Sequence, residues 1–246
     1  MTFKEIKRHA WDSLKGNWGI AILGALIASA LGGIDDSSSG FNFSSGSGSS
    51  STSGSTEQGS AMDQEQLTVL LVVVVSIVLI SLFISLIASA ALFIVGSAVG
   101  VGYAKFNLYL VDGIRPSIGA IFSYFRHLKT CVLAQLFVTI KVTLGLLLFI
   151  VPGFIASYKY SMVSHILADN PQMSAREALY ESARLMDGNK WRYFCFGLSF
   201  IGWALLVVAS FGIASIWVVP YEQAAIAKFY REIKSEKALV YAQPQQ

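Results

Sequence analysis

The sequence predicts an all-α fold of the membrane class: a polytopic helical bundle of about six transmembrane helices, built as three repeats of an amphipathic helix plus a hairpin. The first observation is composition, because 54% of the 246 residues are hydrophobic and only 13% are charged, against about a quarter charged in soluble domains. The second is length, because apolar runs such as 67–110 and 132–150 approach or exceed the roughly 20 residues that a membrane-spanning helix needs. Helices are favoured because each one satisfies its own backbone hydrogen bonds in lipid.

The positions of Lys and Arg predict the topology. Four basic residues precede the first apolar run, 18–33, whereas the Ser- and Gly-rich segment 34–66 contains neither Lys nor Arg. By the positive-inside rule, the N-terminus is cytoplasmic and segment 34–66 is external. Its composition also predicts disorder. The later basic clusters, at 115–129, 176–192 and 228–237, are cytoplasmic by the same rule, so both termini are cytoplasmic.

External hairpin turns between these clusters are predicted at Val151-Pro152-Gly153 and Phe211-Gly212. The first repeat, 1–111, then comprises an interfacial helix 3–15, a span 18–33, the disordered external Ser/Gly loop 34–66 and a long span 67–111. The second repeat, 112–170, comprises an interfacial helix 117–128 and spans 129–150 and 153–169. The third repeat, 171–246, comprises an interfacial helix 174–188, spans 191–210 and 213–235, and a polar tail. One bent helix is preferred for 67–111, because two crossings would place Arg115, Arg126 and Lys129 outside; a re-entrant segment is the alternative.

Similar residues at matching intervals support this division. Thr2 with Glu5, and Ser174 with Glu177, both fit the capping box of a helix N-terminus. A Gly-Asn pair with a tryptophan close behind it lies at the same distance from each cap, as Gly16-Asn17-Trp18 and as Gly188-Asn189-Lys190-Trp191. Between cap and glycine, apolar and small residues recur with helical spacing. They are Phe3, Ile6, Ala10 and Leu14 in the first copy, and Ala178, Ser182 and Met186 in the last. A weaker third copy begins at Ser117, with a stripe of Ile118, Ile121, Phe122, Phe125 and Leu128. Because all copies start on one side, an axis along the membrane normal would relate them.

The returning spans carry a matching interval of their own. Tyr103 precedes Asp112-Gly113 by the distance that separates Tyr160 from Asp169-Asn170, and Tyr221 stands equally far from Tyr230.

Small residues recur at four-residue spacing on the long second span. They are Ser81, Ser85, Ser89, Gly96 and Gly100. Such a face lets helices approach closely, so we predict a helix-packing face and not a ligand site.

Two charges of opposite sign fall near the middle of predicted spans. Lys141 lies about thirteen residues into the third span and Glu222 about ten residues into the sixth. Because a charge in lipid usually pairs or faces the bundle interior, we predict an intramembrane charge pair of Lys141 and Glu222. Lys159, nearer the external end of the fourth span, is expected to snorkel toward headgroups. A substrate or proton path is the alternative role for these charges.

No constellation typical of an enzyme, metal or cofactor site is visible. His165 and Asp169 have the spacing of two metal ligands on one helix face, but nothing supplies a third ligand, so we expect them to pair with each other. Cys131 and Cys195 are far apart and indicate neither a disulfide framework nor a zinc site. The scattered basic residues do not form a nucleic-acid-binding face. We therefore predict no catalytic, metal or cofactor-binding residue.

Several strings together resemble a bacterial multi-pass membrane family, domain of unknown function 975. They are Leu147–Gly153, Tyr158–Met162, Ile166–Pro171, Met186–Trp191, Leu198–Trp203, Pro220-Tyr221 and Phe229-Tyr230. The resemblance covers nearly the whole chain apart from the Ser/Gly insertion and the last residues, and it implies a location in the bacterial cytoplasmic (inner) membrane. The chain departs from the family in its longer external loop and in Gly197, where relatives often carry an acidic residue.

The leading functional hypothesis is a non-enzymatic integral membrane protein that acts through helix packing with lipids or partner proteins. Its partners would be the lipid bilayer and either other membrane proteins or a second copy of the chain. The alternative is a small transporter or channel with a midplane site near Lys141 and Glu222. A third, weaker hypothesis is a lipid-modifying enzyme that uses Asp169, His165 or Asn189.

Overall fold

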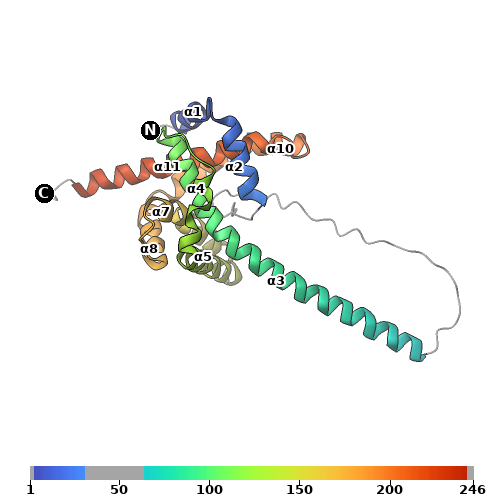
Figure 1. Ribbon diagram of the computed structural model, residues 1–246. Coiled ribbons are helices and arrows are strands. Elements are labelled where there is room, and N and C mark those ends of the chain that lie inside the picture. Colours follow the sequence, from blue (N-terminus) through green and yellow to red (C-terminus); the bar gives the residue numbers. More distant parts are fainter. Residues whose placement is uncertain (1–2, 31–63, 243–246) are drawn as a thin grey trace. The chain divides into compact units, whose positions relative to one another are not determined.

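The computed structural model describes residues 3–30 and 64–242 (Figure 1). It divides into two compact units, one of residues 1–41 and 93–246 and the other of residues 42–92. Every described residue lies in a helix, a turn or a short connection, and no strand occurs among them. The predicted all-α class is therefore confirmed for the described part of the chain.

The helices follow one another along the chain with short connections. They are α1 (Phe3–Leu14), α2 (Trp18–Ala30), α3 (Gln64–Val111), α4 (Gly119–Phe122), the 3-10 helix η1 (Ser123–His127), α5 (Leu128–Leu148), α6 (Ile150–Tyr160), α7 (Val163–Asp169), α8 (Ala175–Leu185), α9 (Lys190–Leu198), α10 (Ile201–Ala209) and α11 (Ser215–Ala242). Within residues 3–30 and 64–242, three stretches are long and apolar enough to cross a membrane, namely Thr68–Val111, Gly119–Leu148 and Lys190–Ala209, and Trp18–Ser29 is a shorter apolar helix. The count of six spans and the side on which the termini lie stay predictions.

The long apolar run forms the single helix α3, without the re-entrant break that was the alternative. Its 48 residues correspond to about 72 Å at 1.5 Å per residue, more than twice the thickness of a hydrocarbon core. Every described side chain from Thr68 to Leu92 is exposed, and all of them except Thr68, Ser76, Ser81, Ser85 and Ser89 are apolar. The predicted Ser/Gly loop lies outside the described residues, except that its last three positions already belong to α3.

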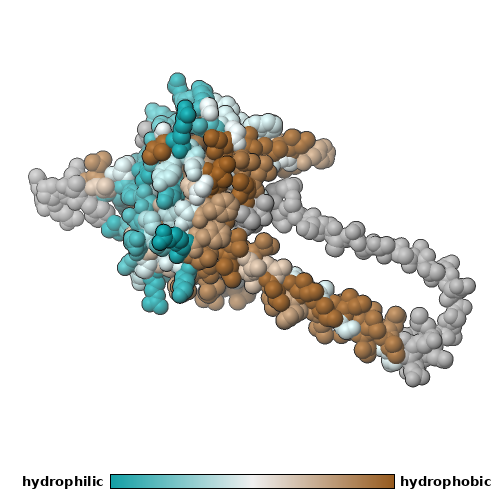
Figure 2. Space-filling model, viewed as in Figure 1, coloured by the Kyte–Doolittle hydropathy of each residue, from teal (hydrophilic) through white to brown (hydrophobic). Residues whose placement is uncertain are grey.

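The unit of residues 1–41 and 93–246 has a hydrophilic and a hydrophobic side. In Figure 2 the hydrophilic residues gather over α1 and α8, whereas the hydrophobic residues gather over α2 and α10. Leu147, in the last turn of α5, is 84% exposed, and Phe211, between α10 and α11, is 98% exposed. A surface divided in this way fits a protein with lipid on one side and water on the other. The turn predicted at Val151-Pro152-Gly153 lies instead at Phe149, because residues 151–153 belong to α6.

The first and third amphipathic helices share their buried stripe and their turn. Ile6, Ala10 and Leu14 of α1 are fully buried, as are Ala178, Ser182 and Met186 at the matching positions after α8 begins. Gly16 and Gly188 both adopt a left-handed φ, of +85° and +81°, which glycine reaches without a steric penalty. The capping box of Ser174 and Glu177 is confirmed, whereas Thr2 lies outside the described residues.

The second copy differs from the prediction of one amphipathic helix over 117–128. It consists of the one-turn helix α4 followed by η1, and its buried residues are Ile121 and Tyr124. Phe122 and Phe125, predicted on the buried stripe, are exposed and stack on each other with ring centroids 5.9 Å apart. This exposure has a geometric reason, because residues three apart lie on one face where the chain turns as a 3-10 helix. Ile121 and Tyr124 then share the buried face, and Phe122 and Phe125 share the exposed one.

Two of the predicted spans are broken helices. The span predicted over 153–169 is divided into α6 and α7, and the span over 191–210 into α9 and α10. At each break, a side chain from an amphipathic helix donates a hydrogen bond to a backbone carbonyl: Ser182 Oγ to the Lys159 carbonyl (2.9 Å), and Lys7 Nζ to the Ser199 carbonyl (2.7 Å). Non-helical backbone in a membrane protein needs such partners.

Two glycines permit close backbone approach. A Cβ atom on Gly153 of α6 would lie 2.7 Å from the backbone nitrogen of Leu146 on α5. A Cβ atom on Gly102 of α3 would lie 1.9 Å from the carbonyl oxygen of Ile121 in α4. Since the obstacle in both cases includes backbone, no side-chain rotation could relieve the overlap.

We expect Gly102→Ala to lower the free energy of unfolding by about 1–3 kcal/mol, because α3 and α4 must move apart. The matched control is Gly202→Ala in α10, where a Cβ atom would meet nothing within 4 Å and the higher helix propensity of Ala acts alone. The measurement is thermal unfolding of both detergent-solubilised variants beside the parent chain. Equal stability of the two variants would contradict the predicted overlap.

Candidate functional site

An arginine on α11 joins the ends of two other helices. The Arg231 guanidinium donates two hydrogen bonds to Asp112, which follows α3, at 3.2 and 2.5 Å. It donates a third, 3.0 Å long, to Asp169 at the end of α7. Lys234 and the Tyr230 hydroxyl also contact Asp169. Both carboxylates stand at helix C-termini, where the helix dipole disfavours negative charge, so these cations stabilise them.

The members of this Arg231 cluster occupy matching places in the predicted repeats. Asp112, Asp169 and Tyr230 each follow an earlier tyrosine by the same interval. The sequence therefore singled out three residues that the fold brings near one arginine. It did not single out Arg231 itself, because its only signal was membership of the last basic cluster.

A second group of charges joins α9 to α11. The Arg192 guanidinium contacts Glu232 and donates to Glu236 Oε2 at 2.8 Å. Because the Glu232 side chain is only 6% exposed, it needs this partner: a buried lone carboxylate is costly. Together with the Arg231 cluster, this group fixes α11 to helices from all three predicted repeats.

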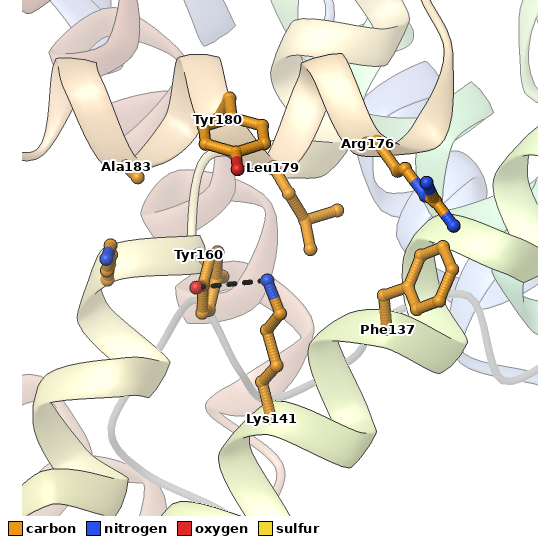
Figure 3. A pocket seen from close by; sticks show the side chains of 8 residues that line it. Phe137, Lys141, Tyr160, Arg176, Leu179, Tyr180 and Ala183 are labelled. Carbon is orange, nitrogen blue, oxygen red and sulfur yellow. Dashed lines mark hydrogen bonds between the residues drawn. The ribbon is translucent and has the colours of Figure 1, made fainter.

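The described part of the chain also contains a cavity of about 460 Å³ between α5, α6 and α8. Its lining residues are Phe137 and Lys141 of α5, Lys159 and Tyr160 of α6, and Arg176, Leu179, Tyr180 and Ala183 of α8. Figure 3 shows Lys141 reaching toward α8 between Tyr160 and Phe137, with Leu179 and Tyr180 on the opposite wall. The cavity is therefore shared by α5, which was predicted to span the membrane with Lys141 near its middle, and by α8, which was predicted to lie at the membrane surface.

Positive charge dominates the cavity. Lys141, Lys159 and Arg176 are all cationic, and no carboxylate is among the lining residues. Lys141 Nζ donates a hydrogen bond to the Tyr160 hydroxyl, 3.4 Å long, and lies 4.9 Å from the centre of that ring. Arg176 lies 6.0 Å from the centre of the Phe137 ring. Aromatic rings hold cations weakly at exposed sites, so these contacts leave most of their donors available.

The carboxylates of α8 have other partners. Glu177 accepts a hydrogen bond from the backbone N–H of Ser174 at 3.0 Å, and this bond holds the pKa of the Glu177 carboxyl below its usual value. Glu181 accepts from Arg184 at 3.0 Å. Neither carboxylate is among the residues that line the cavity.

The two residues of the predicted charge pair have different neighbours. Lys141 lies on Tyr160, and no ion pair of Lys141 occurs among the described residues. Glu222 acts electrostatically on Lys7 and Tyr193. Lys159, expected near the external end of its span, lines the same cavity as Arg176 of the amphipathic helix α8.

The predicted packing face and the predicted His165–Asp169 pair have different outcomes. Ser81, Ser85 and Ser89 are exposed, and the hydroxyls of Ser81 and Ser89 donate to carbonyls of α3 itself. Gly96 is buried and Gly100 is half-buried; packing through this face stays a prediction. The expected pairing of His165 with Asp169 is wrong, because both His165 ring nitrogens are buried and have no hydrogen-bond partner in the described part of the chain.

A family model described as "Protein of unknown function (DUF975)" matches residues 110–237, more than half of the chain. The chain belongs to the DUF975 family. The match covers less than the predicted resemblance, because it leaves out the first 109 residues, but it contains the whole cationic cavity and the whole Arg231 cluster. Gly197, the predicted departure from the family, has open space where a Cβ would stand. Neither the curated proteins nor the solved structures compared with the chain contain a match.

We expect Arg231→Met to lower the free energy of unfolding by about 2 kcal/mol, because Asp112 and the 17%-exposed Asp169 lose charged hydrogen bonds. The matched control is Arg184→Met, which breaks the exposed pair with Glu181 and should cost no more than about 0.5 kcal/mol. Denaturant titration of the solubilised chain measures both changes. Equal losses would show that the Arg231 cluster does not join the helices.

Proposed function

We propose that this DUF975 protein is a non-enzymatic, multi-pass protein of the bacterial cytoplasmic membrane that acts through contacts with lipids or partner proteins. The observation that carries the proposal is the exposure of every side chain of α3 from Thr68 to Leu92, a stretch that holds no charged residue and is apolar apart from one threonine and four serines. About 37 Å of helix at 1.5 Å per residue exceeds the thickness of a hydrocarbon core. A surface of this extent would be insoluble in water and is ordinary in lipid.

The amphipathic helices support a position at the cytoplasmic headgroup level. α1 and α8 bury one stripe and leave Lys and Arg on the other side, as helices at a membrane surface do. The basic residues near α4, α8 and the end of α11 follow the positive-inside rule. In this proposal all four basic clusters, and both termini, face the cytoplasm, and the chain crosses the bilayer six times.

The charged groups described above support a role without catalysis. In the Arg231 cluster, both carboxylates are engaged by cations, so their charges are used to join helices. The cationic cavity contributes donors, whereas its lining includes no carboxylate, imidazole or thiol to act as a general base. These features favour binding over chemical conversion.

A small transporter or channel is the second candidate, because Lys141 lines a cavity as that hypothesis requires. Glu222, the other residue of the hypothesis, is not among the lining residues. A transport path must open to both sides of the membrane. A cysteine introduced at Ala183 on the cavity wall would then react with a membrane-impermeant thiol reagent from either side, whereas a binding site would react from the cytoplasmic side alone.

The topology can be tested with single cysteines after Cys131 and Cys195 are replaced by serine. We expect Phe211→Cys to be labelled by a membrane-impermeant maleimide in intact cells, because it marks an external turn. Arg184→Cys should be labelled only after the membrane is opened, because α8 is cytoplasmic. Both positions are exposed, so burial would not explain a failure to react. Labelling of Arg184→Cys in intact cells would rule out the proposed topology.

A further inference from the structure

We propose that the cationic cavity between α5, α6 and α8 binds the phosphate group of an anionic glycerolipid, whose acyl chains lie along the exposed side of α5. This inference rests on the proposed function, because it requires the cavity to open at the cytoplasmic surface of a bilayer. It places Lys141 and Lys159 nearer that surface than the predicted spans do. It adds a ligand class and a defined site to that function.

The charge of the cavity argues for an anion. Three cations line one space, and none of them forms an ion pair among the described residues. Like charges that line one space repel one another, and a bound anion would lower that repulsion. The planar guanidinium of Arg176 can donate two parallel hydrogen bonds to a phosphate, while Lys141 and Lys159 act as point charges.

The groups that could compete with an anion are weak or occupied elsewhere. The only hydrogen bond that the Lys141 ammonium donates among the described residues is the long one to Tyr160. Glu177 and Glu181, the acidic residues of α8, are engaged by Ser174 and Arg184. The hydroxyls of Tyr160 and Tyr180 add neutral donors on two sides of the cavity.

The size and the rim of the cavity favour a lipid over free phosphate. A volume of about 460 Å³ falls within the range of about 300–1,000 Å³ typical of small-molecule sites. On α5, the apolar side chains of Leu136, Ile140 and Leu144 are exposed. Each stands one residue before a member of the neighbouring helix stripe, whose residues Phe137 and Lys141 line the cavity. Tyr180 at the rim is 81% exposed, and tyrosine is common at headgroup level. A basic space beside an aliphatic stripe suits a ligand with a charged head and apolar tails.

The test is native mass spectrometry of the full chain in detergent, with phosphatidylglycerol or phosphatidylcholine of equal acyl chains added. Wild-type protein should prefer phosphatidylglycerol. The double variant Lys141→Gln/Arg176→Gln should bind it about twenty-five-fold more weakly, about fivefold for each lost cation. The control Arg184→Gln/Lys190→Gln removes the same net charge outside the cavity and should stay within about twofold of wild type. Lys141→Arg should retain binding, because it keeps the charge.

Equal weakening in the two double variants would overturn the site, because net charge alone would then account for binding. Inorganic phosphate is the competitor: if it displaces phosphatidylglycerol at equal concentration, the cavity holds free phosphate and the lipid assignment fails. Thermal unfolding of every variant separates lost binding from lost structure. The cysteine labelling above is independent of these results, so the site can fail while the membrane topology stands.

Discussion

The ion pairs of Arg231 with Asp112 and Asp169 are the interaction on which the arrangement of the returning helices depends. They join α11 to the ends of α3 and α7, three helices that are far apart in sequence. Each carboxylate sits at the negative end of a helix, so each needs a cation more than an isolated carboxylate would. One arginine with a forked guanidinium can serve both, which a lysine could not do with the same geometry.

The amphipathic helices complete this arrangement by satisfying backbone groups of other helices. Lys7 of α1 and Ser182 of α8 donate to carbonyls at the two helix breaks. Tyr124 of η1 donates to the carbonyls of Leu167 and Ala168, where α7 ends. An unpaired carbonyl in an apolar environment is costly, so each interfacial helix stabilises irregular backbone elsewhere in the unit. The helix breaks therefore depend on the amphipathic helices for their hydrogen-bond partners.

The cationic cavity follows from the same arrangement. Ser182 fixes α8 to the end of α6, and glycines at 145 and 153 bring α5 and α6 close together. Lys141, Lys159 and Arg176 then line the same cavity, although their positions in sequence suggest three different depths. The shared lining supports the proposed binding of a lipid phosphate, whereas Lys141 forms no ion pair among the described residues.

The sequence by itself determined the helical class, the amphipathic stripes of α1 and α8, and the capping box at Ser174. These features depend on local periodicity and on contacts three or four residues apart, which are written directly in residue order. Tertiary structure alone decided that α6–α7 and α9–α10 are broken, that Gly102 is a point of close approach, and that Lys141 contacts Tyr160. Each of these depends on groups brought together from distant parts of the chain, and the sequence of a single protein does not record such distances.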